Sequence, residues 1–162
     1  MTQRLDGKKA LVLVSSGVDE TAMSMLQREL LHAGATIKTV GTEPGLVNSW
    51  NDKAWGLYFP VDIQISQALG SDFDLLIVPS GARGIRKLSA NPHAERILSS
   101  FLVARKPVCL MGDAFELLVN TGHAGHEKSA NVMTGECAGE VPAFLQKMIA
   151  HFTGGEPMKI AA

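Results

Sequence analysis

Hydrophobic and polar positions along the chain form two alternating kinds of segment. Apolar runs without polar alternation, at Lys9–Ser15, Asp74–Val78 and Val108–Met111, are typical of β-strands buried on both faces. Between them, apolar residues recur every three or four positions, as in Asp19–Ala33, which predicts amphipathic helices. Strands that alternate with such helices favour a parallel sheet covered on both faces. We therefore predict an α/β fold, a flavodoxin-like doubly wound parallel sheet with helices on both faces.

The remaining elements follow from weaker versions of the same patterns. The stretch Gly41–Pro60 is irregular and predicts a short β-excursion at the sheet edge. The loop Pro79–Gly84 is rich in glycine and follows a buried strand directly. We also expect strands over Ala35–Val40 and Val132–Thr134, and helices over Asp62–Leu69, from Pro92 through Leu102, over Ala114–Asn120 and over Pro142–Phe152.

The length of 162 residues fits one domain, which we expect over residues 7–152, with an N-terminal tail over 1–6 and a C-terminal tail over 153–162. Hydrophobic residues make up 46% of the chain and charged residues 19%, which excludes a disordered chain. A net charge of −1 argues against a nucleic-acid or anionic-membrane surface. The apolar runs of the predicted strands are too short to span a bilayer. Two cysteines are too few for a disulfide framework. We expect a cytoplasmic protein.

Ligands of doubly wound sheets bind beyond the carboxyl ends of the strands, where the crossovers change direction. Three loops that follow predicted strands are therefore candidates for a pocket, at residues 15–20, 79–84 and 112–114. The first of these loops lacks the glycine patterns of a dinucleotide or phosphate site, and Asp19 and Glu20 would repel a phosphate, so a flavin or nucleotide carrier is a minor alternative and no cofactor is expected. The candidate pocket residues are Ser16, Gly17, Glu20, Ser80, Gly81, Ala82, Arg83, Gly112, Asp113 and Ala114.

Other reactive side chains have simpler structural interpretations. Cys109 lies in a buried strand and is expected to be inert, whereas Cys137 lies in a glycine-flanked loop. His123 and His126 lack further metal ligands at suitable spacing, so no metal site is expected. Capping of the following helix explains Asp113 more simply than acid–base chemistry.

The segment Lys106–Leu118 resembles the nucleophile-elbow segment of the ThiJ/PfpI superfamily, in which a Lys-Pro-Val strand delivers a cysteine into a sharp turn. Asp72–Gly84 is similar to the strand and Pro-Gly-Gly-Ala loop of that family, with Ser80 in place of the first glycine. Leu88–Ala94 and Lys9–Asp19 are similar to its next helix entry and its first strand. The resemblance implies the class I glutamine amidotransferase-like version of the predicted fold.

The resemblance fails at the reactive positions. The position of the nucleophilic cysteine is Gly112, that of the following histidine is Asp113, and that of the acid partner is Ala22. A hydrogen atom cannot replace a thiolate, so the peptidase, glyoxalase or deglycase chemistry of the family does not carry over. Glycine also relieves the positive φ of such an elbow. These substitutions predict a non-catalytic member, an interaction or small-ligand-binding module. The alternative is a hydrolase or lyase with Asp113 or Glu116 as base and Ser16 or Ser80 as nucleophile or donor.

One branch of the superfamily, the C-terminal domain of large-subunit catalases, shares the cysteine-less elbow. Its turn and Glu-Leu-Leu sequence are similar to Gly112–Leu118, and its first loop is similar to Ser16–Asp19. The resemblance implies a free-standing relative of that appendage, with a stress-related role and no catalase activity. Pairing of superfamily members, together with Trp50 and Trp55 in the irregular excursion, predicts a homodimer. A small-molecule ligand or a protein partner is also expected.

Overall fold

The computed structural model describes residues 5–135 and 141–152. Its centre is a six-stranded sheet in which every neighbouring pair is parallel, in the order β5-β2-β1-β6-β7-β8. The strands of this sheet are β1 (Lys9–Val14), β2 (Thr36–Gly41), β5 (Ile63–Gln64), β6 (Leu75–Val78), β7 (Val108–Met111) and β8 (Val132–Gly135).

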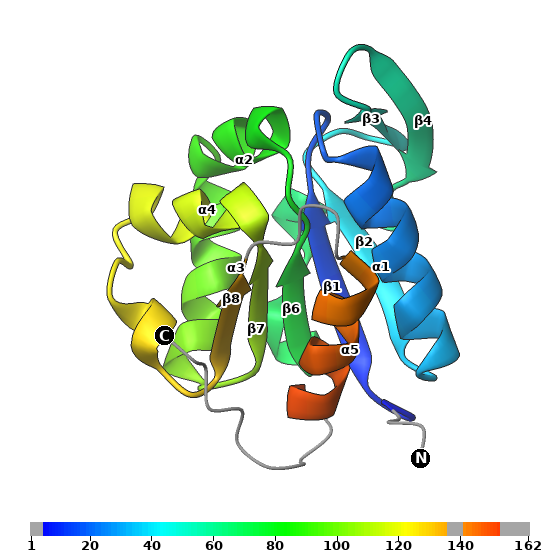
Figure 1. The fold of residues 1–162 in the computed structure, drawn as a ribbon. Coiled ribbons are helices and arrows are strands. Elements are labelled where there is room, and N and C mark those ends of the chain that lie inside the picture. Colours follow the sequence, from blue (N-terminus) through cyan, green and yellow to red (C-terminus); the bar gives the residue numbers. More distant parts are fainter. Residues whose placement is uncertain (1–4, 136–140, 153–162) are drawn as a thin grey trace.

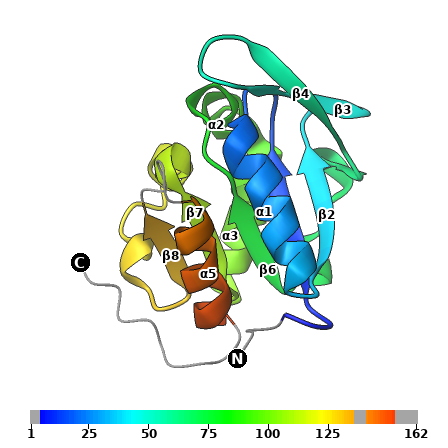
Figure 2. The same cartoon turned by 45° about the vertical axis from the view of Figure 1, so that its right-hand side comes forward.

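Helices cover both faces of the sheet, as Figures 1 and 2 show. Alternate strand residues point to opposite faces, so Val12 belongs to one buried cluster and Leu11 and Leu13 to the other. One face packs against α1 and α5, and the other against α2, α3 and α4. The bounds of the helices are α1 (Glu20–His32), α2 (Ala82–Ser89), α3 (Pro92–Val103), α4 (Phe115–Asn120) and α5 (Val141–Phe152).

The predicted fold class, a doubly wound parallel α/β sheet of the flavodoxin type, is confirmed. The chain order of the strands reverses between β1 and β6, so the sheet is built outward from this pair in both directions. The carboxyl ends of β1, β6 and β7 therefore lie side by side at the same edge, at the top of Figure 1. The candidate loops emerge from these three ends.

Three local predictions are wrong. Residues 62–69 form no helix: they hold the short strand β5 and a single 3-10 turn, Ile65–Gln67. The loop predicted over Pro79–Gly84 ends early, because α2 begins at Ala82. Leu5, expected in a tail, is buried, and its N–H donates to the carbonyl of Ala33 over 2.6 Å.

The irregular excursion is a separate two-stranded antiparallel hairpin, β3 (Leu46–Trp50) and β4 (Trp55–Pro60). It was predicted at the sheet edge, but it stands above the carboxyl ends of the strands (Figure 1). Backbone hydrogen bonds attach it to the loop after β1: the Gly17 N–H donates to the Asn48 carbonyl and the Trp50 N–H to the Val18 carbonyl, each over 2.8 Å. The hairpin thus becomes part of the wall of the candidate site.

Candidate functional site

The elbow after β7 has the predicted backbone conformation but carries no side chain. Gly112 has φ +53°, a region that disfavours residues with a Cβ atom. A Cβ atom placed there would lie 3.2 Å from the Cβ of Ser80, so the elbow faces the loop after β6. Ala22, which the resemblance predicts at the position of the acid partner, is fully buried on α1. Position 112 therefore has no thiol, and position 22 has no carboxylate that could activate one.

Asp113, the next residue, bonds across the strand ends to the loop after β6. Its Oδ1 accepts a hydrogen bond from the Gly81 N–H over 2.7 Å. Gly81 is the residue before the first turn of α2 and has φ +136°, and a Cβ atom there would lie 2.6 Å from the Asp19 nitrogen. Only glycine fits this position, and its N–H points to the elbow. An N–H at this place could stabilise a developing oxyanion, but the Asp113 carboxylate already occupies it.

The loop after β1 interlocks with the loop after β6 through main-chain contacts. The Asp19 N–H donates to the Ser80 carbonyl over 2.8 Å. A Cβ atom at Gly17 would lie 2.4 Å from the Cβ of Arg83. These contacts leave no space between Gly17 and the start of α2. The structure thus brings together five of the predicted residues, namely Gly17, Ser80, Gly81, Gly112 and Asp113, together with the Cβ of Arg83.

Ser16 is engaged by a residue that the sequence did not single out, Glu43. The Glu43 carboxylate accepts hydrogen bonds from both the N–H and the hydroxyl of Ser16, and the hydroxyl accepts one from the Asn48 N–H over 3.1 Å. Ser16 is only 7% exposed. Its hydroxyl therefore connects β1, the segment after β2 and the hairpin, and it is covered where a nucleophile would need access. No sequence spacing connects Glu43 with Ser16, 27 positions away.

Glu20 faces the hairpin. Its Oε1 accepts hydrogen bonds from the Leu57 N–H over 2.7 Å and from the Ser49 hydroxyl over 3.2 Å. A carboxylate that accepts two hydrogen bonds at a helix start is favourable for both the helix and the hairpin. Glu20 is therefore an anchor for the hairpin.

Arg83 also contacts the hairpin through its guanidinium. This group stacks over the Trp50 ring, 4.0 Å from its centroid, and the edge of Trp55 meets Trp50 at 5.3 Å. The stack is a cation–π contact that draws the hairpin toward the start of α2.

Asp19 has the one shifted pKa resolved among the described residues. The pKa of its carboxyl is raised, first because burial disfavours the charged form and then because of the negative charges of Asp52, Asp113 and Glu20. The hydrogen bond from the Ala22 N–H, which caps α1, opposes this shift. The strand ends thus hold a half-buried acid next to the Asp113 carboxylate.

The remaining candidates differ in their exposure. Ala82 is exposed at the start of α2, Ala114 is buried below the elbow, and Glu116 is exposed on α4. Cys109 is buried in β7, as predicted, while Cys137 lies outside the described residues. His123 Nε2 lies 3.1 Å from Glu95 Oε1, and the centroid of its ring lies 5.8 Å from that of His126. Within residues 5–135 and 141–152, no group of three His, Cys, Asp or Glu side chains is arranged to hold a metal ion.

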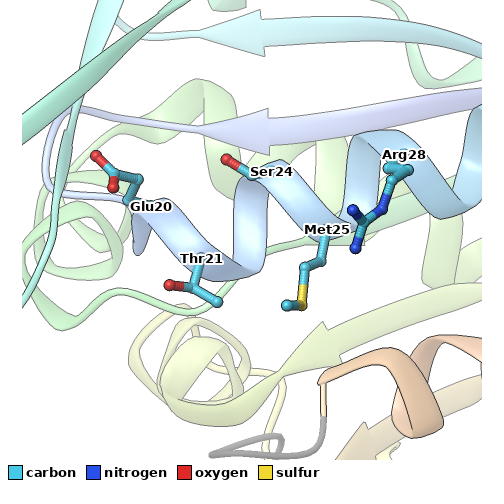
Figure 3. Close-up of a pocket in the computed structure, with 5 residues that line it drawn as sticks. All are labelled: Glu20, Thr21, Ser24, Met25 and Arg28. Atoms are coloured by element: carbon cyan, nitrogen blue, oxygen red, sulfur yellow. The ribbon is translucent and has the colours of Figure 1, made fainter.

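A shallow cavity of about 250 Å³ lies along the outer side of α1, between Glu20 and Arg28 (Figure 3). Thr21, Ser24 and Met25 complete its described lining. All five side chains belong to one helix, so this cavity is a surface groove, distinct from the elbow.

Comparison with known proteins identifies the family of the chain. Residues 8–140 match the DJ-1/PfpI family. The chain belongs to this family. A search of the curated proteins finds no match. Within the part of the chain that the structure describes, no helix is both long and apolar enough to cross a membrane.

Solved structures share the fold at low identity. Drosophila melanogaster DJ-1beta is 20% identical with a TM-score of 0.79, over 97% of this chain and 94% of that one. A cysteine-to-alanine mutant of a DJ-1 superfamily protein from Salmonella typhimurium is 22% identical with a TM-score of 0.76, over 92% of each chain. An Anabaena variabilis protein with DJ-1/ThiJ/PfpI-like and ferritin-like domains is 16% identical with a TM-score of 0.78, over 96% of this chain. The chain spans about half, 52%, of that two-domain protein.

Proposed function

We propose that the chain is a non-catalytic member of the DJ-1/PfpI family that acts as an interaction or small-ligand-binding module in the cytoplasm. The observation that carries the proposal is the pair of residues at the elbow. Gly112 supplies no nucleophile, and the Asp113 carboxylate occupies the Gly81 N–H at 2.7 Å, where a reacting oxygen could otherwise bind. A carboxylate in this place also repels an anionic intermediate. The chain keeps a turn with positive φ at Gly112 but has no nucleophilic side chain there.

Within the family, we propose that the chain is closest to the cysteine-less C-terminal domains of large-subunit catalases. The support is the sequence of the elbow, Gly112–Leu118, and of the first loop, Ser16–Asp19. The role that we propose is that of a free-standing relative of such a domain, with no catalase activity of its own.

The second candidate is a hydrolase or lyase that uses carboxyl groups. It is favoured by the raised pKa of Asp19, because a carboxyl group that keeps its proton nearer neutrality is a better general acid. The hydrogen bonds of Ser16 with Glu43 and Asn48 weigh against this candidate. They occupy the hydroxyl of Ser16, one of the two serines that could act as its nucleophile.

A turnover assay separates the two candidates. Purified wild-type protein is incubated with α-oxoaldehydes, glycated amino acids and peptides, the substrate classes implied by the family, and consumption is followed by mass spectrometry. We expect no consumption above that of heat-denatured protein. Turnover by the wild type that disappears in Asp19→Asn, with unchanged turnover in Asp72→Asn on the surface, would establish the carboxyl enzyme instead.

We further propose that the protein associates with itself. The support is the exposure of apolar side chains on the hairpin, where Trp55, Leu57 and Tyr58 are 48%, 58% and 62% exposed. Exposed aromatic side chains of this kind are enriched at interfaces. Light scattering on the wild type is expected to give twice the 17.3 kDa of one chain.

A further inference from the structure

The guanidinium of Arg83, in the first turn of α2, is attached to the hairpin by one contact only. Its Cζ lies 4.0 Å from the centroid of the Trp50 ring, which is the geometry of a cation–π stack. Arg83 is exposed, and no hydrogen bond or ion pair joins its guanidinium to any residue that the structure describes. A cation–π contact is weak at an exposed site. The face of Trp50 therefore accepts a guanidinium group, and the one that covers it is easily displaced.

Carboxylates lie near this stack. Asp19 forms an isolated β-bridge with Trp50, and the negative charges of Asp52 and Asp113 act on Asp19. Asp52 is exposed, and its carboxylate has no hydrogen bond or ion pair within residues 5–135 and 141–152, not even with its neighbour Lys53. A group of like charges attracts a ligand of the opposite sign. Asp52 is therefore free to bind a guanidinium, whose parallel N–H groups match a carboxylate.

The hairpin holds the ring and this carboxylate in place. Trp50 and Trp55 pair across the two strands, and their rings meet at 5.3 Å with an angle of 84° between their planes. In the turn between them, the Asn51 N–H donates to the Ala54 carbonyl over 3.0 Å, and the Ala54 N–H donates to Asn51 Oδ1 over 3.2 Å. The turn also fixes Asp52 at φ +80°, which few residues other than glycine adopt. A ligand that binds here finds its aromatic and acidic partners already ordered.

We infer that a guanidinium ligand, free or as the arginine side chain of a peptide, replaces Arg83 over the Trp50 ring and binds the Asp52 carboxylate. This inference rests on the ligand-binding role proposed above and names the chemical class of the ligand. Arg83 then acts as an internal competitor, which moves into the solvent when the ligand binds. The site requires neither the elbow at Gly112 nor an exposed Trp55, so it is compatible with self-association through the hairpin.

Calorimetric titration of the wild-type protein tests the class of ligand. The two guanidinium probes are ethylguanidinium and a blocked Gly-Arg-Gly peptide, and the controls of equal charge are ethylammonium and a blocked Gly-Lys-Gly peptide. We expect each guanidinium probe to bind about fivefold more tightly than its ammonium control, because only the planar cation both stacks and pairs with a carboxylate. The tighter of the two guanidinium probes identifies the source of the ligand. Equal binding of guanidinium and ammonium probes, or no binding, overturns the inference.

Removal of the competitor tests the position of the site. Arg83→Ala is expected to tighten the binding of the guanidinium probes about threefold or more, because the wild-type ring is covered for part of the time. A gain in affinity cannot come from a misfolded variant. The matched control is Arg86→Ala, an equal loss of charge on the exposed side of α2, which should leave the affinity unchanged. An Arg83→Ala variant that binds no more tightly than Arg86→Ala overturns the exchange.

Loss of the two binding partners completes the test. Trp50→Leu is expected to abolish the binding of both guanidinium probes, and Asp52→Asn, which tolerates the positive φ of the turn, to weaken it about fivefold. Circular dichroism checks that both variants are folded, and unchanged affinity in a folded Trp50→Leu overturns the site. A wild type that binds no guanidinium and turns over no substrate overturns this inference alone. Turnover by the wild type overturns the non-catalytic function, whatever the titration gives.

Discussion

The carboxylate of Asp113 accepts a hydrogen bond from the main-chain N–H of Gly81 across a distance of 2.7 Å. The two residues lie 32 positions apart, at the ends of two neighbouring strands. Gly81 precedes the first turn of α2, where the N–H groups give the helix a positive end. Asp113 therefore serves as a capping acceptor that comes from another loop.

Replacement of Asp113 tests this capping role. Asp113→Ala removes the acceptor, so the free energy of unfolding is expected to fall by about 1 kcal/mol, the usual value for a lost helix cap. Asp113→Asn keeps an acceptor oxygen and should lose less. Urea unfolding followed by circular dichroism measures both. Equal stabilities of Asp113→Ala and the wild type would show that the contact contributes nothing.

Much of the architecture could be predicted because it depends on local pattern. Runs such as Val108–Met111 are apolar at every position because both faces of the strand are covered, and the glycine at 112 has the positive φ expected of an elbow. The short helix α2 was missed because only Gly84, Ile85 and Leu88 are buried in it, and the Pro-Ser-Gly sequence before it is typical of a loop.

The wall of the site could not be predicted, because it is made by contacts between distant segments. Glu43 binds Ser16 from 27 positions away, and Glu20 binds Leu57 from 37 positions away. The sequence places no constraint on where the hairpin stands relative to β1, so Glu20 was assigned to the pocket. Its carboxylate in fact holds the hairpin.

The pH dependence of stability is expected to contain a contribution from Asp19. The pKa of this carboxyl is raised in the folded protein, mainly by burial, so the folded state holds the proton more tightly than the unfolded state does. Asp19 therefore contributes stability at low pH that is lost as the pH rises from its ordinary value of 3.8 through the folded pKa.

Asp19→Asn removes this titration and keeps a capping side chain. Relative to the wild type, the variant is expected to gain stability as the pH is raised from about 3.8 to 7. Denaturant midpoints over this range give the comparison, with Asp72→Asn as the surface control. A constant difference between Asp19→Asn and the wild type at every pH would contradict the raised pKa.

Thiol reagents are expected to modify Cys137 before Cys109. Cys109 is fully buried in β7, between β6 and β8, so its thiol is reached only when the sheet opens. Maleimide labelling with mass mapping of the peptides measures the order, and addition of urea should bring Cys109 labelling up to the rate of unfolding. Rapid modification of Cys109 in native buffer would mean that the central sheet is less stable than its packing indicates.

Side chains at Gly112 separate the strain of the elbow from its crowding. Gly112→Ala is expected to lower the free energy of unfolding by about 1 kcal/mol for the positive φ. A further loss comes from the contact at 3.2 Å with Ser80. Gly122→Ala is the matched control, because Gly122 has φ +84° but nothing within 4 Å of its Cβ position. Guanidinium unfolding of both variants should therefore show the larger loss at Gly112, and Ser80→Gly should bring the two losses together.

If the elbow faces the Ser80 loop as described, Gly112→Cys, in a Cys137→Ser background, folds and its thiol is labelled by maleimide faster than Cys109. A thiol at 112 that stays unlabelled in the folded protein would show that this turn does not open onto the solvent, and that no ligand reaches the strand ends from the elbow.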